Sequence, residues 1–139
     1  MTTSNVVQLK DATIQNTDFR RVLVTGAHSQ LVVMSVLPGE DIGDEVHEVD
    51  QILYVVDGQG QASLDGQSTA FEAGAMIWVP ASTRHNIINT GQKPLRLFTV
   101  YAPPEHADGT VHATRADADK AEAAEAALHD ISAVPEPGP

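Results

Sequence analysis

The chain has 139 residues, no cysteine, and 19 acidic against 8 basic side chains, a net charge of −11. This length is enough for one domain with its own core. The charge argues against nucleic acid or an anionic membrane as a partner, because both bind basic surfaces. The lack of cysteine excludes disulfides, thiol nucleophiles and thiolate metal sites. No apolar run reaches the roughly 20 residues of a membrane span, and the first ten residues do not resemble a signal peptide, so we expect a cytoplasmic protein.

Short apolar runs separated by turn signals fill the chain from Val22 to Tyr101, a pattern typical of strands. The predicted strands cover residues 22–25, 31–37, 52–56, 62–64, 69–71, 76–79, 86–89 and 95–101. Asp65-Gly66 predicts a tight hairpin, because both residues tolerate positive φ. We expect one or two further strands near the N-terminus, over 6–10 and 12–15. Many short strands without a helical period predict an all-β sandwich or barrel.

Residues 105–139 differ in composition from the rest of the chain. They carry eight acidic and two basic side chains, and alanine is frequent among them. We therefore predict a barrel domain over 1–104 and an acidic, alanine-rich tail over 105–139. Within the tail, Thr114 is suited to cap a helix over about 114–131, with too little apolar bulk to do more than lie on a surface or on a partner chain. The prolines and glycine of 134–139 predict a disordered end.

Two segments, 39–58 and 74–89, hold the side chains best suited to chemistry. The first contains Glu45, His47 and Gln51, all odd-numbered, so a continuous strand would place them on one face. If residues 48–50 turn the chain, Gln51 lies on the neighbouring strand instead. In the second segment His85 follows a proline-containing turn and leads into a strand. Either arrangement of the first segment allows Glu45, His47 and Gln51 to converge in one interior.

Together the two segments resemble the paired motifs of the cupin superfamily. The residues that match both motifs at the family's spacing are Gly39, His47, Gly58, Gly74, Pro80, His85 and Asn89. Glu45 stands where the motif has its first histidine, Gln51 where it has glutamate, and Ser82 where it has a glycine. The resemblance covers about residues 30–102. It implies a double-stranded β-helix, a jelly-roll barrel, here followed by a short C-terminal helix.

The resemblance also implies that one divalent transition metal is held by Glu45, His47, Gln51 and His85. An amide is a weaker, neutral donor than the family's carboxylate at that position, so we expect lower affinity. If Gln51 binds the ion, the set of two nitrogens and two oxygens suits Mn, Fe, Ni, Co or Zn. If Gln51 only binds a metal-bound water, the other three resemble the two-histidine-one-carboxylate triad of non-haem Fe(II) enzymes.

Each candidate also has a purely structural interpretation. His47 and His85 are of a type that often packs against or caps strands, and Glu45 lies in an acidic cluster of a kind that usually forms a solvated loop. His106 and His112 follow Pro103-Pro104, where they either cap the barrel mouth or belong to a loop, and we expect a loop.

Three functions from different classes follow. The first is a metal-dependent enzyme acting on a small organic molecule in the barrel pocket, as an oxygenase or as an isomerase, lyase or cyclase, with the ion as Lewis acid or O₂ site. The alternative is a binding protein that captures a sugar or metabolite without turnover. The third is an interaction role for the acidic tail. Because an open jelly roll has edges to cover, and small cupins commonly pair, we expect a homodimer.

Overall fold

The computed structural model describes residues 5–133 of the chain, and the side chains of residues 5–126. Its elements are α1 (Leu9–Gln15), β1 (Arg20–Thr25), β2 (Gln30–Val36), β3 (Asp50–Asp57), β4 (Gln59–Leu64), β5 (Gln67–Glu72), β6 (Met76–Val79), β7 (His85–Asn89), β8 (Leu95–Ala102), β9 (Val111–His112) and α2 (Arg115–Ala133). The predicted fold, all-β with a short C-terminal helix, is confirmed.

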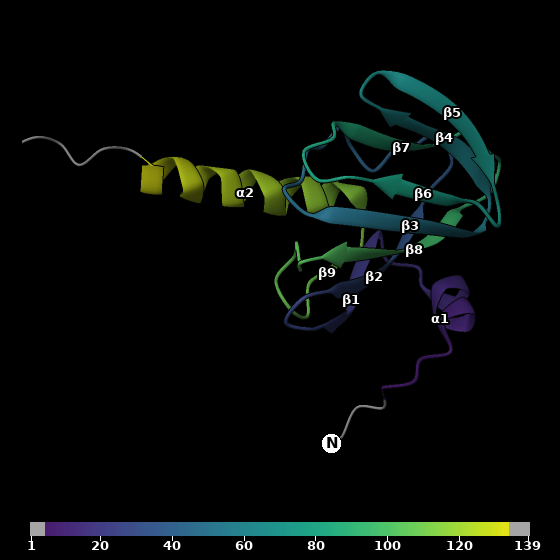
Figure 1. The fold of residues 1–139 in the computed structure, drawn as a ribbon, viewed down its shortest axis with the longest axis horizontal. Coiled ribbons are helices and arrows are strands. Elements are labelled where there is room, and N and C mark those ends of the chain that lie inside the picture. Colours follow the sequence, from purple (N-terminus) through teal and green to yellow (C-terminus); the bar gives the residue numbers. More distant parts are fainter. Residues whose placement is uncertain (1–4, 134–139) are drawn as a thin grey trace, which may run out of the picture.

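The strands form two antiparallel sheets that face each other across the core (Figure 1). One has six strands in the order β6-β3-β8-β2-β1-β9, and the other has three in the order β5-β4-β7. The segment before β3 extends the smaller sheet, because isolated bridges join Asp41 to Ile88 and Glu45 to His85. Segments far apart in sequence are thereby brought to the same end of the barrel.

The inward-facing residues divide the barrel interior into an apolar end and a polar end. On β3 the inward row is Gln51, Leu53 and Val55, because side chains alternate across a strand. On the neighbouring β8 the inward row is Leu95, Leu97, Thr99 and Tyr101, running in the opposite direction. Leucine and valine therefore meet at one end, whereas the amide, hydroxyl and phenol groups meet at the other.

Two turns hold non-glycine residues with positive φ among the described residues. Asp65 and Gly66 have φ of 48° and 84° and join β4 to β5, as the hairpin prediction required. Ser82 has a φ of 68°, although it carries a side chain. It thus adopts the left-handed conformation that a glycine would reach more easily at that position.

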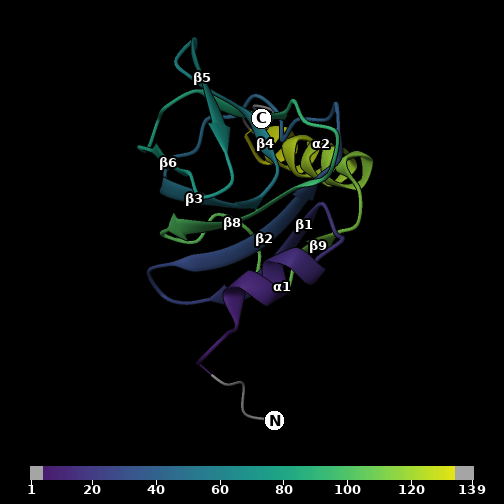
Figure 2. The same cartoon turned by 90° about the vertical axis from the view of Figure 1, so that its right-hand side faces the viewer.

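The prediction of strands over 6–10 and 12–15 is wrong. Residues 9–15 form the helix α1, and residues 5–8 belong to no strand. Leu9, Ala12, Thr13 and Asn16 are its more buried positions, with the spacing of one helical face. That face packs on the outside of the six-stranded sheet, against β2, β3 and β8 (Figure 2). As a helix, this short segment buries its less polar side against the sheet.

The helix α2 begins at the barrel mouth and extends away from it (Figure 1). The Thr114 hydroxyl accepts a hydrogen bond from the Asp117 amide at 3.1 Å, which is the predicted cap. Ala118, one turn later, is buried in the core. The predicted disordered end, 134–139, lies outside the described residues. Within the described part, neither helix combines the length and apolarity needed to cross a membrane.

Candidate metal centre at the barrel mouth

The two motif segments are bound together through their backbones. Glu45 and His85 exchange two hydrogen bonds, each with N and O 2.9 Å apart. The amide of Ser82 donates to the carbonyl oxygen of His47 at 2.7 Å, so the turn before β7 holds the loop that carries His47. These contacts place Glu45, His47 and His85 at the polar end of the interior.

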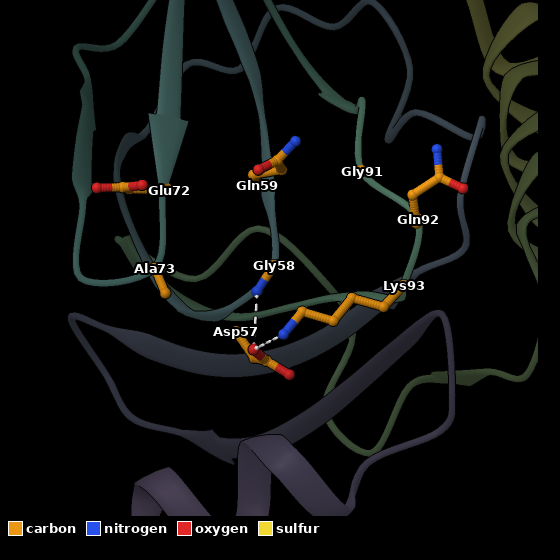
Figure 3. Close-up of a pocket in the computed structure, with 8 residues that line it drawn as sticks. All are labelled: Asp57, Gly58, Gln59, Glu72, Ala73, Gly91, Gln92 and Lys93. Carbon is orange, nitrogen blue, oxygen red and sulfur yellow. Dashed lines mark hydrogen bonds and ion pairs between the residues drawn. The ribbon is translucent and has the colours of Figure 1, made fainter.

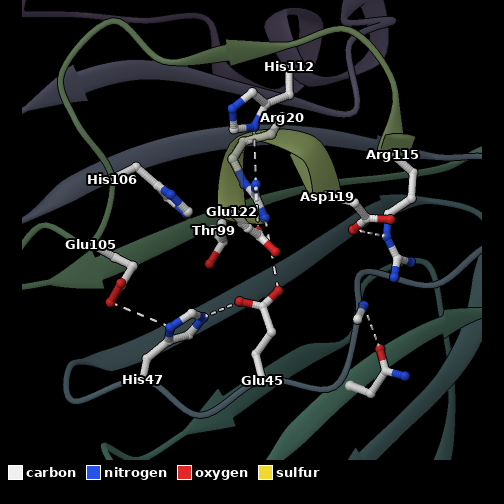
Figure 4. Close-up of polar contacts among 12 residues, drawn as sticks. Arg20, Glu45, His47, Thr99, Glu105, His106, His112, Arg115, Asp119 and Glu122 are labelled. Carbon is white, nitrogen blue, oxygen red and sulfur yellow. Dashed lines mark hydrogen bonds and ion pairs between the residues drawn. The ribbon is translucent and has the colours of Figure 1, made fainter. Parts of the chain in front are cut away.

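His47 lies between two carboxylates (Figure 4). Its Nε2 is 2.9 Å from Oε2 of Glu45, and its Nδ1 is 3.4 Å from Oε1 of Glu105. Burial lowers the pKa of His47, but the hydrogen bonds to Glu105 and Glu45 outweigh burial and raise it to about 9. Burial by itself raises the pKa of Glu45. The hydrogen bond from His47 and the positive charges of His47 and Arg20 outweigh burial, so the pKa of Glu45 lies below its usual range.

His85 presents one ring nitrogen to the interior. Its Nδ1 lies 2.9 Å from the carbonyl oxygen of Thr83, and a carbonyl can only accept, so Nδ1 carries the proton. In the neutral ring, Nε2 then holds a free lone pair. The ring is nearly buried, and its centroid is 5.2 Å from that of His47. The two imidazoles are therefore close neighbours in the site.

Gln51 lies on β3, which begins at Asp50, and the chain bends at residues 48–49, so Gln51 and Glu45 do not share one continuous strand. The side chain is only 4 % exposed, and its Nε2 donates to the Thr99 hydroxyl at 3.0 Å. Its carbonyl oxygen Oε1 is buried and has no hydrogen-bond partner among the described residues. An acceptor in that position costs free energy unless something binds it.

No three His, Asp or Glu side chains within residues 5–126 are arranged to hold a metal ion as they stand. Two donors, Glu45 and His47, are occupied with each other. The donor types nevertheless fit a divalent transition metal: one carboxylate, two imidazoles and an unpartnered amide oxygen. The residues thus suit the metal that the resemblance implies, while metal binding itself stays a prediction.

Above these side chains a cavity of about 180 Å³ opens between the barrel and α2. It is lined by Arg20, Glu45, His47, Glu105, His106, Ala107, Thr110, His112, Glu122 and Glu125. His106 lies in a loop, as expected, whereas His112 belongs to β9, and both also line the cavity. Burial and the nearby Arg20 lower the pKa of His106 to about 3, so this ring is neutral near pH 7.

Arg20 organises the charges around this cavity, although its side chain is only 1 % exposed. Its guanidinium lies 3.4 Å from Oε1 of Glu122 on α2 and 4.0 Å from Oε1 of Glu45. It also donates to Nδ1 of His112 at 3.2 Å. The sequence analysis missed Arg20, Glu105 and Glu122, because all three lie outside the two motifs.

A larger hollow, about 570 Å³, lies at the opposite end of β3 (Figure 3). Gln51 and Asp57 are separated by six residues of strand, roughly 20 Å. In this hollow Lys93 Nζ is 2.8 Å from Asp57 Oδ1, which also accepts from the Gly58 amide. Of the side chains that the structure describes, the one cation that lines it, Lys93, is already paired with Asp57, and no histidine lines it. The smaller cavity at the mouth is therefore the better candidate for chemistry.

Asn89, Tyr54 and Trp78 all lie away from the cavity at the mouth. Asn89 of the second motif is buried, and its Nδ2 donates to the carbonyl oxygens of Val36 and Lys93. It thus ties β7 to the ends of two neighbouring segments and does not face the mouth. Tyr54 and Trp78 lie on the outer face of the six-stranded sheet, where both are exposed, rather than in the pocket.

Comparisons with known proteins show the family and the fold of the chain. The cupin domain model matches residues 32–101. The chain is 47% identical to the uncharacterised Bacillus subtilis (strain 168) protein YrkC over 125 residues, 84% of this chain and 67% of YrkC.

Solved structures have the same fold. The crystal structure of BH2720 from Bacillus halodurans matches with a TM-score of 0.82 and 43% identity, over 83% of this chain and 92% of that one. A predicted oxalate decarboxylase from Thermotoga maritima matches with a TM-score of 0.53 and 24% identity, over 56% of this chain and 69% of that one, which is similarity of fold alone. The chain belongs to the cupin family.

Proposed function

We propose that this cupin binds one divalent transition metal, Fe, Mn, Zn, Ni or Co, through Glu45, His47, Gln51 and His85. The contact between Glu45 and His47 is the main support, because their donor atoms lie 2.9 Å apart. Two donors bonded to one ion at about 2.1 Å lie about 3 Å from each other. An ion replacing the proton between them would need little movement of either side chain.

The other two donors support the same position. His85 keeps the Nε2 lone pair free, since Nδ1 is engaged by Thr83. Gln51 has a buried carbonyl oxygen that no described residue binds. In this proposal the amide completes the set as a weak donor, which keeps the affinity below that of a set with four strong ligands.

We propose further that the protein is an enzyme of the oxygenase, isomerase, lyase or cyclase type, acting on a small organic molecule in the mouth cavity. A bound divalent ion would polarise an oxygen of that molecule as a Lewis acid. The chain supplies the surrounding polar groups: Arg20 as a donor, and the neutral ring of His106. Helix α2 covers the cavity through Glu122 and limits the access of water.

The charge of the mouth narrows the substrate class. Four carboxylates line the cavity, those of Glu45, Glu105, Glu122 and Glu125, against one guanidinium, that of Arg20. Such a surface repels anions even after a divalent ion has bound. We therefore propose a small neutral or cationic substrate, and we do not extend the name of the Thermotoga maritima protein to this chain.

Elemental analysis of the purified protein tests the metal proposal. Protein prepared without added metal is loaded in turn with Fe, Mn, Zn, Ni and Co, and bound metal is counted per chain. We expect one ion per chain in the natural protein and none in the His47→Ala, His85→Ala double variant. His28→Ala is the matched control, because His28 is exposed and outside the site. Equal metal content in the double variant would overturn the proposal.

Ligand binding without turnover is the second candidate. The amide at position 51 favours weak metal binding, because it is a neutral donor that already donates to Thr99. If metal content stays well below one ion per chain under all loading conditions, a binding protein for a small ligand becomes the better interpretation.

The homodimer, the cytoplasmic location and the domain limits at 104 and 105 stay predictions.

A further inference from the structure

Glu105 approaches His47 from the side opposite to the candidate ligands. Its Oε1 lies 3.4 Å from Nδ1 of His47, while Nε2 of the same ring faces Glu45 (Figure 4). Glu105 belongs to the segment after β8, beyond the residues that match the cupin model. Glu105 therefore contacts the motif residue His47 from outside the two motif segments.

The backbone at Glu105 is held in place from the core. Gln30 on β2 is 1 % exposed, and its Oε1 accepts from the amides of Glu105 and His106 at 3.1 and 2.9 Å. Its Nε2 donates to the carbonyl oxygen of His106 at 2.7 Å. The buried side chain of Gln30 thus binds three backbone groups of residues 105 and 106. These hydrogen bonds fix the backbone from which the Glu105 carboxylate extends.

A carboxylate at Nδ1 decides how the imidazole can act. An ionised carboxylate only accepts hydrogen bonds, so the proton stays on Nδ1. Once an ion replaces the proton between Nε2 and Glu45, the lone pair of Nε2 is the one that the ring offers, on the side of Glu45. Histidines that bind metals commonly donate their other N–H to such a partner, which fixes the ring orientation and strengthens the donor.

We propose that Glu105 is a positioning residue, which orients His47 for a divalent ion and sets the affinity of the site. This inference rests on the proposed function, because it assigns a role in the same metal site. It does not make Glu105 a ligand, since its carboxylate contacts the ring nitrogen that faces away from Glu45.

Titration calorimetry with Co²⁺ tests the role, together with the visible spectrum of the Co²⁺-loaded protein. We expect Glu105→Ala to bind Co²⁺ about 10- to 100-fold more weakly. Glu105→Gln keeps an oxygen that accepts from Nδ1, so it recovers part of the affinity and leaves the spectrum unchanged. Glu125→Ala is the matched control, because it removes a carboxylate from the same cavity without a contact to His47 in the described side chains. We expect its affinity to stay within about twofold of the natural protein.

Three results would overturn the inference while leaving the proposed function intact. Affinity within twofold of the natural protein in Glu105→Ala would show that Glu105 does not act on the site. An equal loss in Glu125→Ala would show a general effect of charge. A loss in Glu105→Gln as large as in Glu105→Ala, with an altered spectrum, would show that Glu105 is itself a ligand. If the natural protein binds no Co²⁺, nor any other divalent transition metal, the proposed function fails, and this inference fails with it.

Discussion

Arg20 donates a hydrogen bond to Nδ1 of His112, across the pairing of β1 with β9, at a distance of 3.2 Å. Since a guanidinium has only donors, His112 must accept with an unprotonated nitrogen. Burial and Arg20 accordingly lower the pKa of His112. This pair joins the first strand of the barrel to the segment before α2, and the same guanidinium reaches Glu45.

Replacing Arg20 should therefore destabilise the protein. In Arg20→Met, Glu45 and Glu122 lose a cationic neighbour, and we expect the free energy of unfolding to fall by about 2–4 kcal/mol. Urea denaturation of the metal-free protein measures this change. Arg21→Met is the matched control: Arg21 follows on the same strand but is 52% exposed, so its effect should stay within about 0.5 kcal/mol. Similar effects of both substitutions would contradict the role given to Arg20.

Restoring the family's carboxylate at position 51 should strengthen metal binding. In Gln51→Glu a charged oxygen replaces the neutral one, and we expect binding of a divalent ion to tighten about tenfold, or about 1.4 kcal/mol. The metal-free variant should be less stable than the natural protein, because residue 51 is 4% exposed and a buried charge is costly. Calorimetric titration and thermal unfolding without metal measure the two effects.

Gln61→Glu makes the same chemical change at an exposed position of β4 and should leave both quantities unchanged. Gln51→Leu should weaken metal binding, since it removes the oxygen altogether. Weaker binding in Gln51→Glu than in the natural protein would mean that the side chain does not face the ion.

The contact between Asp41 and Arg115 predicts a pH dependence at the base of α2. Burial raises the pKa of Asp41, but hydrogen bonds from Asn86 and Arg115 outweigh this and lower it below 3.8. A lowered pKa in the folded state stabilises the protein above about pH 4 and ceases to do so as the pH falls through the folded-state pKa. Arg115 has a second acidic partner, Asp119, at a distance of 3.0 Å.

Thermal unfolding of the natural protein and of Asp41→Asn between pH 6 and pH 2.5 tests this. We expect the natural protein to be the more stable one at pH 6, with a difference that shrinks toward zero at the acidic end. The other carboxylates titrate in both proteins, so the difference reports Asp41. A difference that stays constant with pH would be incompatible with this assignment.

An exposed apolar patch predicts where a second copy of the chain would dock. Ile52, Tyr54, Met76 and Trp78 lie on the outer face of β3 and β6, in register as two cross-strand pairs. None of the four is charged, so two copies of a chain with net charge −11 meet here without opposing carboxylates. We expect Trp78→Glu to convert a dimer to a monomer in light scattering. Val24→Glu, at an exposed apolar position on β1, should leave the dimer intact, and a dimer that survives Trp78→Glu places the interface elsewhere.

The sequence predicts the strands of the barrel better than it predicts the residues at the barrel mouth. Turn signals such as Asp65-Gly66 act locally, so they locate strands reliably. The motif spacing indicated Glu45 and His85, which the fold joins backbone to backbone. The short helix α1 was missed because its pattern, Leu9 to Asn16, spans only two turns and its buried positions include polar residues.

The residues that surround the motif side chains at the mouth could not be predicted, because they come from distant segments. Arginine on a strand usually faces solvent, so nothing in the sequence marks Arg20 as buried. Its partners His112 and Glu122 lie 92 and 102 positions away. Glu105 depends on an anchor, Gln30, that lies 75 positions earlier. Only tertiary structure brings these groups together.

The two backbone hydrogen bonds between Glu45 and His85 hold these positions together without using their side chains. The separation between these two positions is set by peptide groups, which are identical in every residue except proline. A histidine or a glutamate can therefore be exchanged at position 45 without shifting its neighbour across the bridge. A barrel built this way can change the chemical group that position 45 presents, one codon at a time, while its architecture persists.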